Sequence, residues 1–147
     1  MSAKLTDTLT ANLSGAYRQA YINAPAQTPG LHIATGTKIN DVPQHRRRLS
    51  LNYVDDYRGI ARINGAYVGP MHDVSYYHET LSPYALRDAR AGVSKSAWTV
   101  YLFGTNVTSK RAGLTIDNTI FGWQQPTLTR FTSNQPPTIG LQYQTKL

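Results

Sequence analysis

The chain closes with the stretch T-I-G-L-Q-Y-Q-T-K-L, residues Thr138–Leu147, in which apolar and polar residues alternate. Ile139, Leu141 and Tyr143 share one parity, while glycine, glutamine and lysine occupy the other. Side chains of a β-strand point alternately to the two faces of a sheet, so this alternation predicts a strand with one apolar and one polar face. A strand needs neighbours for its backbone hydrogen bonds, and further strands are therefore expected.

Five other segments alternate in the same way, and no segment has helical periodicity. The fifth of them switches parity: Trp98 and Leu102 share one side, while Tyr101 and Phe103 share the other. The sequence therefore predicts a single all-β domain over residues 1–147, an antiparallel up-and-down meander of about six strands. The five segments are residues 5–18, 48–53, 61–67, 84–94 and 98–105.

The links between these segments alternate between short and long. Residues 55–58 and 94–97 are hairpin-length links, whereas residues 22–44, 70–83 and 108–137 form long ones. Loop length has no reason to alternate in a soluble sandwich, but outer-membrane barrels have short periplasmic turns and long extracellular loops. This pattern favours lipid at the apolar face and a polar lumen. The alternative is a small soluble β-barrel that binds an apolar ligand in its interior.

Composition is compatible with a membrane barrel. The formal charge is +7, there are ten tyrosines and no cysteine, and the mean hydropathy is −0.41. A transmembrane strand needs only about 10 alternating residues, so this hydropathy does not argue against a bilayer. The cluster His45–Arg48 precedes the second segment and is expected at the mouth of a strand, where it could meet lipid phosphates. Because the other cations are scattered singly, no nucleic-acid partner is expected.

No motif in the sequence indicates catalysis. We find no nucleophile elbow, metalloprotease helix or phosphate-binding glycine loop, so the chain is not expected to be an enzyme or to hold a cofactor. His72 and His78 lie in a long link together with Asp73 and Glu79, but their spacing fits no established ligand pattern. No metal site is therefore predicted.

Residues Tyr84–Arg111 read Y-A-L-R-D-A-R-A-G-V-S-K-S-A-W-T-V-Y-L-F-G-T-N-V-T-S-K-R. This stretch resembles the penultimate hairpin of TonB-dependent outer-membrane receptors, with landmarks at Arg90–Val93, Trp98 and Leu102–Phe103, and then Asn106–Val107 and Lys110–Arg111. The segments Pro136–Leu141 and Asp41–His45 are also similar to parts of that family.

The resemblance implies a C-terminal part of a barrel of about 22 strands, in the outer membrane of a Gram-negative bacterium. Such receptors take up scarce ligands such as siderophores, cobalamin or sugars. Their partners are outer-membrane lipid and lipopolysaccharide, the barrel-assembly machinery, and the TonB complex acting through a plug domain that this chain lacks. Family members usually end in Phe, so Leu147 implies less efficient insertion. Six strands would leave two open edges, and we expect a piece of a longer reading frame.

Several residues have expected roles within this arrangement. Trp98 is expected in an interfacial aromatic girdle, Asn106 at a strand end, and Arg62 and Arg90 on the lumen side. Aromatic and arginine side chains dominate binding hot spots, so those in the long links are the candidates for ligand contact. They are Tyr76, Tyr77, Phe121, Trp123 and Arg130.

Overall fold

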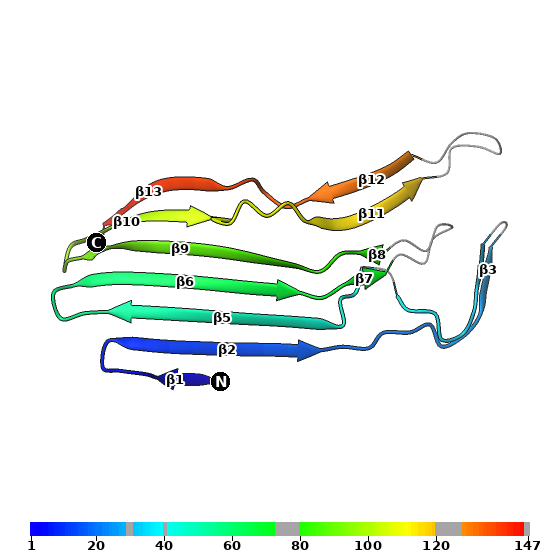
Figure 1. Ribbon diagram of the computed structural model, residues 1–147, viewed down its shortest axis with the longest axis horizontal. Coiled ribbons are helices and arrows are strands. Elements are labelled where there is room, and N and C mark those ends of the chain that lie inside the picture. The colour runs from blue at the N-terminus through cyan, green and yellow to red at the C-terminus, as the bar shows by residue number, and fades with distance from the viewer. Residues whose placement is uncertain (29–30, 40, 73–79, 120–127, 146–147) are drawn as a thin grey trace.

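The computed structural model describes residues 1–28, 31–39, 41–72, 80–119 and 128–145. Its main feature is one seven-stranded antiparallel sheet in which neighbours along the chain are neighbours in the sheet (Figure 1). This confirms the predicted all-β up-and-down meander. The strands, in order, are β1 (Ser2–Lys4), β2 (Leu9–Tyr17), β5 (His45–Val54), β6 (Gly59–Val68), β9 (Tyr84–Ser94), β10 (Trp98–Thr105) and β13 (Thr138–Thr145).

The sheet has one strand more than predicted, because the short strand β1 precedes the first alternating segment. Residues 5–8 form a tight turn in which the backbone N–H groups of Leu5 and Thr6 both donate to the carbonyl of Leu9, at 2.8 and 3.2 Å. Lys4 and Asp7 are joined across this turn by a salt bridge of 2.7 Å. The alternation therefore runs through a turn, and the residues before it form β1 antiparallel to β2.

Short turns and long links lie at opposite ends of the sheet (Figure 1). Residues 55–58 close the β5–β6 turn, where the Gly59 N–H donates to the Asp55 carboxylate at 2.6 Å and Arg58 has a φ of 70°. Each long link carries a small hairpin that the alternation did not predict. These are β3 (Ala26–Thr28) with β4 (Leu31–Ile33), β7 (Met71–His72) with β8 (Thr80–Leu81), and β11 (Gly113–Thr119) with β12 (Leu128–Ser133).

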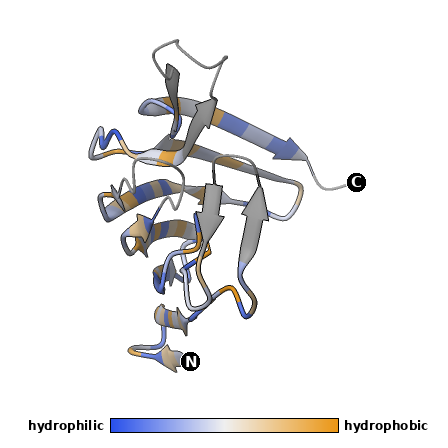
Figure 2. Ribbon diagram, turned by 90° about the vertical axis from the view of Figure 1, so that its right-hand side faces the viewer, coloured by the Kyte–Doolittle hydropathy of each residue, from blue (hydrophilic) through white to orange (hydrophobic). Residues whose placement is uncertain are grey.

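The register separates the two faces of the sheet, since directly paired residues in a sheet share a face. One row across the sheet is apolar, and the adjacent row is largely polar. The apolar row is Leu9, Tyr53, Ala61, Ala91, Leu102 and Leu141. The other is Thr10, Asn52, Arg62, Arg90, Phe103 and Gly140. Hydrophobic and hydrophilic positions alternate along the strands in Figure 2.

The basic cluster lies within a strand, not before one. His45 and the three arginines that follow it are the first residues of β5, so they alternate between the faces. Arg47 falls on the apolar face beside Tyr67, while Arg46 and Arg48 fall on the polar face. The cluster was expected at the mouth of a strand and does lie there, but the ladder already includes it, so β5 begins earlier than the alternation indicated.

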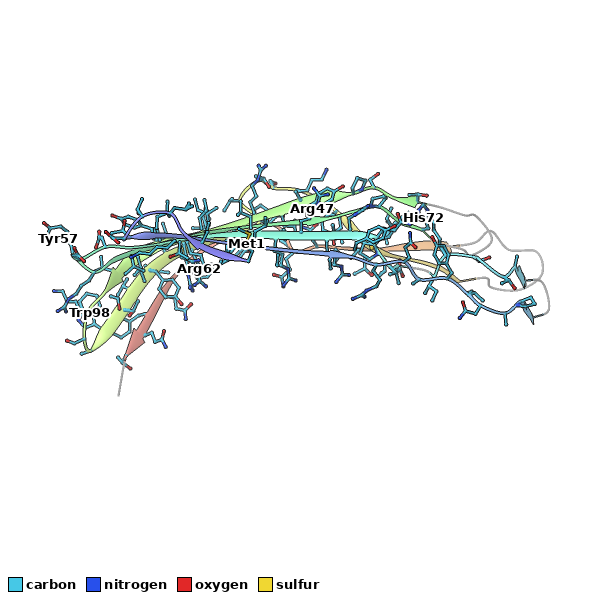
Figure 3. All side chains as sticks on the ribbon, turned by 90° about the horizontal axis from the view of Figure 1, so that it is seen from below. Met1, Arg47, Tyr57, Arg62, His72 and Trp98 are labelled. Carbon is cyan, nitrogen blue, oxygen red and sulfur yellow. The ribbon has the colours of Figure 1, made fainter. Side chains whose placement is uncertain are left out.

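The sheet is a single layer over the described residues, with side chains on both faces (Figure 3). Among the residues whose side chains are described, the buried apolar ones are Met71, Leu81 and Ala112, and the first two pack with Val68 and Tyr84 at the long-link end. Within the described part of the chain, no helix has the length and hydrophobicity that a membrane crossing requires.

Candidate functional site

The apolar face of the sheet is exposed over the described residues. Leu141, Leu102 and Ile63 are 72%, 58% and 54% exposed, although they lie in the middle of paired strands. Monomeric soluble proteins rarely expose contiguous apolar patches larger than a few hundred Å². The apolar residues also do not converge on a common interior within the described residues, as an apolar-ligand barrel would require. An exposed apolar face of this kind marks a contact with lipid or with another apolar surface.

Aromatic side chains border the apolar face at both ends. Trp98 lies at the short-turn end, where the Lys95 ammonium is 5.5 Å from its ring centroid. At the long-link end the rings of Tyr17 and His45 are 5.1 Å apart, and Tyr67 lies on the same face.

Two aromatic residues of the apolar face, Tyr53 and His45, lie near opposite ends of β5. Along β5, Tyr53 and His45 are separated by about 27 Å of strand at ~3.4 Å per residue. Strand tilt reduces this to a height of about 20 Å, close to the apolar band of about 25 Å on outer-membrane barrels.

A groove opens at the long-link end, between the start of β9 and the chain that follows β10. Its volume is about 430 Å³, and its lining includes Ser82, Tyr84, Lys110, Arg111 and Phe131. Lys110 and Arg111 are exposed, and Phe131 is 58% exposed. Two cations beside two aromatic rings suit a ligand that carries negative charge and flat apolar groups.

Asn106 fixes the chain where it leaves β10. Its φ is 47°, its side chain is only 6% exposed, and its backbone N–H donates to the Asp88 carboxylate at 2.9 Å. The Asn106 amide donates to the carbonyls of Lys110 and Gln135, at 3.0 and 3.1 Å, and accepts from the Lys110 N–H at 3.0 Å. The predicted strand-ending role is confirmed. These bonds also hold the base of the groove, because Lys110 is one of its walls.

Asn134 completes this polar cluster from the other side of the long link. Its carbonyl oxygen accepts from the Ala112 N–H at 2.8 Å, and its amide donates to the Lys110 carbonyl at 2.8 Å. The two asparagines therefore join the chain before β11 to the chain after β12. The hairpin β11–β12 is thereby anchored to the sheet at its base.

Two arginines face each other on the polar side of the sheet. Arg62 in β6 is paired directly with Arg90 in β9. The Arg62 Nε donates to the Asn52 side chain, and the Arg90 guanidinium lies 5.3 Å from the ring centroid of Tyr101. A cavity of about 140 Å³ opens between these side chains. Like charges directly opposite each other destabilise a sheet unless an anion lies between them.

Most of the predicted ligand contacts cannot be placed. Tyr76, Tyr77, Phe121 and Trp123 lie outside the described residues. Arg130 lies in β12 with its backbone paired to Asp117, and its side chain is also outside the description. The sequence did not predict the residues of the groove, which are Tyr84, Lys110, Arg111 and Phe131. The two adjacent cations Lys110 and Arg111 in a long link could have indicated a site for an anionic ligand.

The histidine pair in the β6–β9 link is only half described. His72 lies 3.3 Å from the Lys38 ammonium through Nε2 and 3.2 Å from the Thr80 hydroxyl through Nδ1. His78 lies outside the described residues. Across the described ranges, no group of three or more metal-ligating side chains comes together.

Comparison of the sequence with known protein families and with curated proteins finds no match. The fold, in contrast, is similar to parts of solved structures. The siderophore receptor PiuA from Acinetobacter baumannii matches with a TM-score of 0.72 over 97% of this chain, at 12% identity. The ferric yersiniabactin uptake receptor FyuA from Yersinia pestis matches with a TM-score of 0.69 over 97% of this chain, at 14% identity. The chain spans 20% and 21% of the lengths of these receptors, so the fold is that of a section of their β-barrels.

Proposed function

We propose that the chain forms part of the wall of a TonB-dependent receptor in the outer membrane of a Gram-negative bacterium. The observation that carries this proposal is the apolar face, which is continuous across seven strands and uncovered over the described residues. Lipid removes such a face from water without a second protein layer. The fold similarity to two siderophore receptors supports the same placement.

The uptake of a siderophore is the specific activity that we infer for the whole receptor. Both similar structures bear the names of siderophore or ferric-chelate receptors. Ferric chelates that are anionic and aromatic match the groove at the long-link end, which we assign to the extracellular side. Lys110 and Arg111 would attract the charge, and Tyr84 and Phe131 would contact the rings.

The remaining partners follow from the same placement. The long links would carry further ligand contacts, including Tyr76, Tyr77, Phe121, Trp123 and Arg130. Arg47, on the apolar face at the long-link end, would meet the phosphates of lipopolysaccharide. The other strands of the barrel, a plug that contacts TonB, and insertion by the barrel-assembly machinery complete the proposed receptor.

The placement of the two faces can be tested with single labels, because the chain has no cysteine. Ile63 and Asn64 are adjacent in β6 and lie on opposite faces. An environment-sensitive fluorophore is attached to the introduced thiol of Ile63→Cys or Asn64→Cys, and each labelled protein is placed in lipid vesicles. We expect lipid with brominated acyl chains to quench the label at position 63, and aqueous iodide to quench the label at position 64.

Two other outcomes would contradict the proposed placement of the two faces. Equal quenching of both labels by brominated lipid would contradict a wall with one lipid face. A blue-shifted label at position 63 that brominated lipid does not reach would favour the soluble barrel with an apolar interior.

A further inference from the structure

The polar face of the central strands carries an excess of positive charge. In β5, β6 and β9 it holds Arg46, Arg48, Arg62 and Arg90 against a single acidic residue, Asp88. One oxygen of the Asp88 carboxylate accepts a hydrogen bond from the Asn106 N–H and so stabilises the turn at the end of β10. Among the described residues, the one salt bridge is Lys4–Asp7, at the edge of the sheet. The arginines therefore have no carboxylate partner in the described part of the chain.

Arg62 and Arg90 differ from Arg46 and Arg48 because they line a cavity. They are directly paired, and the cavity of about 140 Å³ lies between them. Arg62 is oriented by its hydrogen bond to Asn52, and Arg90 is oriented by the Tyr101 ring. Two guanidinium groups held in this way can bind an anion through several charge-assisted hydrogen bonds.

Apart from the two arginines and Asn52, the lining of the cavity is mainly apolar or aromatic, which narrows the choice of anion. Val54 and Ile60 are paired with each other on the polar face and line the cavity together with Tyr101. A free phosphate has no group that would contact these three side chains. An aspartate or glutamate side chain has a hydrocarbon stem for them and a carboxylate for the two arginines.

We propose that the cavity between Arg62 and Arg90 binds a carboxylate side chain from a polypeptide segment that packs against the polar face. The proposal rests on the proposed function, in which this face borders a lumen that large transporters fill with protein. It adds a specific contact, near the short-turn end of the wall, between the barrel and the segment inside it. Charge complementarity with the arginine pair defines the partner as acidic.

The test is site-specific photo-crosslinking in the receptor that carries this chain, in outer membranes. Tyr101→p-benzoylphenylalanine keeps an aromatic ring at the cavity. Val54→p-benzoylphenylalanine serves as a second probe, because Val54 is 57% exposed at the same cavity and tolerates a larger group. We expect an adduct to a polypeptide segment that contains Asp or Glu at the crosslinked site.

The arginine dependence decides between recognition and mere proximity. In the double variant Arg62→Gln and Arg90→Gln, the yield of that adduct should fall about tenfold. Arg48→Gln should leave it unchanged, because Arg48 lies on the same face but does not line the cavity. An adduct whose yield does not depend on Arg62 and Arg90 would overturn the proposal.

Other occupants give different results. If no polypeptide adduct forms, and inorganic phosphate raises the Tm only when Arg62 and Arg90 are present, the cavity binds a free anion and the proposal is wrong. An adduct to lipid would mean that the polar face borders the bilayer, which contradicts the proposed function itself. Lack of an adduct to an acidic segment, with the lipid and aqueous faces as proposed, overturns only this inference.

Discussion

At the scale of single residues, Asn106 combines two properties that are separable by mutation. Its positive φ of 47° favours Asn or Gly, and its buried amide makes three hydrogen bonds to the backbone. The sequence predicted the first property, because Asn commonly ends strands in turns. It could not predict the second, since Lys110 is close in sequence but Gln135 lies far along the chain.

We predict that Asn106→Gly raises the rate of amide exchange at Lys110 by lowering the free energy of local opening by about 1–3 kcal/mol. Glycine keeps the backbone conformation and removes the side-chain bonds. Asn106→Ala should cost about 1 kcal/mol more, because Ala is strained at this φ. Ser109→Gly is the control: Ser109 is exposed and also has a positive φ, of 51°. Equal exchange in Asn106→Gly and Ser109→Gly would show that the Asn106 bonds do not hold the link.

At the scale of elements, the register of β10 explains why aromatic residues occupy both sides of this segment. Tyr101 and Phe103 are aromatic residues on the polar face, and each is paired with a glycine of a neighbouring strand. A Cβ at Gly92 in β9 would collide with the Val100 carbonyl oxygen and lie 2.5 Å from the Tyr101 Cβ, and one at Gly140 in β13 would lie 2.5 Å from the Phe103 Cζ. The Phe103 ring thus packs over the missing side chain of Gly140, while β10 leaves no room for a side chain at Gly92. This pairing depends on register, which a single sequence does not show.

We predict that Gly92→Ala weakens the pairing of β9 and β10 and lowers the free energy of unfolding by about 1–3 kcal/mol, since overpacking displaces Tyr101 or the backbone. Gly65→Ala is the matched control, because Gly65 lies in a paired strand with no atom within 4 Å of the added Cβ. It should change stability by about 1 kcal/mol or less, in the stabilising direction. Denaturant titration in detergent micelles measures both. Equal midpoints for the two variants would contradict the packing explanation.

Element length also decided what the sequence could predict. The long strands were predicted, because eight or more residues provide several periods of alternation; they are β2, β5, β6, β9, β10 and β13. Strands of two or three residues, such as β7 and β3, are too short to show a period. β1 is three residues long and was missed for the same reason. Length does not explain the missed hairpin β11–β12, whose strands have seven and six residues.

At the scale of the whole molecule, the two ends of the sheet differ in the way that the alternating links predicted. The short-turn end holds compact turns, while the long-link end holds the hairpins (Figure 1). The groove also lies at the long-link end. The up-and-down meander and its apolar and polar faces were predicted from the periodicity of the sequence. The groove was not predicted, because it brings Tyr84 next to Lys110 and Phe131 from later in the chain, and this requires the Asn106 and Asn134 anchors.

The difference between the two ends predicts that ligand binding responds to charge at the long-link end. In cells that express the receptor, Lys110→Glu together with Arg111→Glu should weaken the binding of an anionic ferric catecholate by about tenfold or more, because two attractive charges become repulsive. Binding of a neutral ferric hydroxamate should change much less. Lys95→Glu, at the short-turn end beside Trp98, should alter neither affinity.

Titration with each radiolabelled chelate measures the two affinities. Addition of salt provides a second check, since screening should weaken the catecholate complex of the unmodified receptor more than that of the double variant. If the double variant binds both chelates as the unmodified receptor does, the groove is not part of the ligand path, although the wall could still lie in the membrane. If Lys95→Glu has the larger effect, the ligand approaches from the short-turn end, and the assignment of the long links to the extracellular side is wrong.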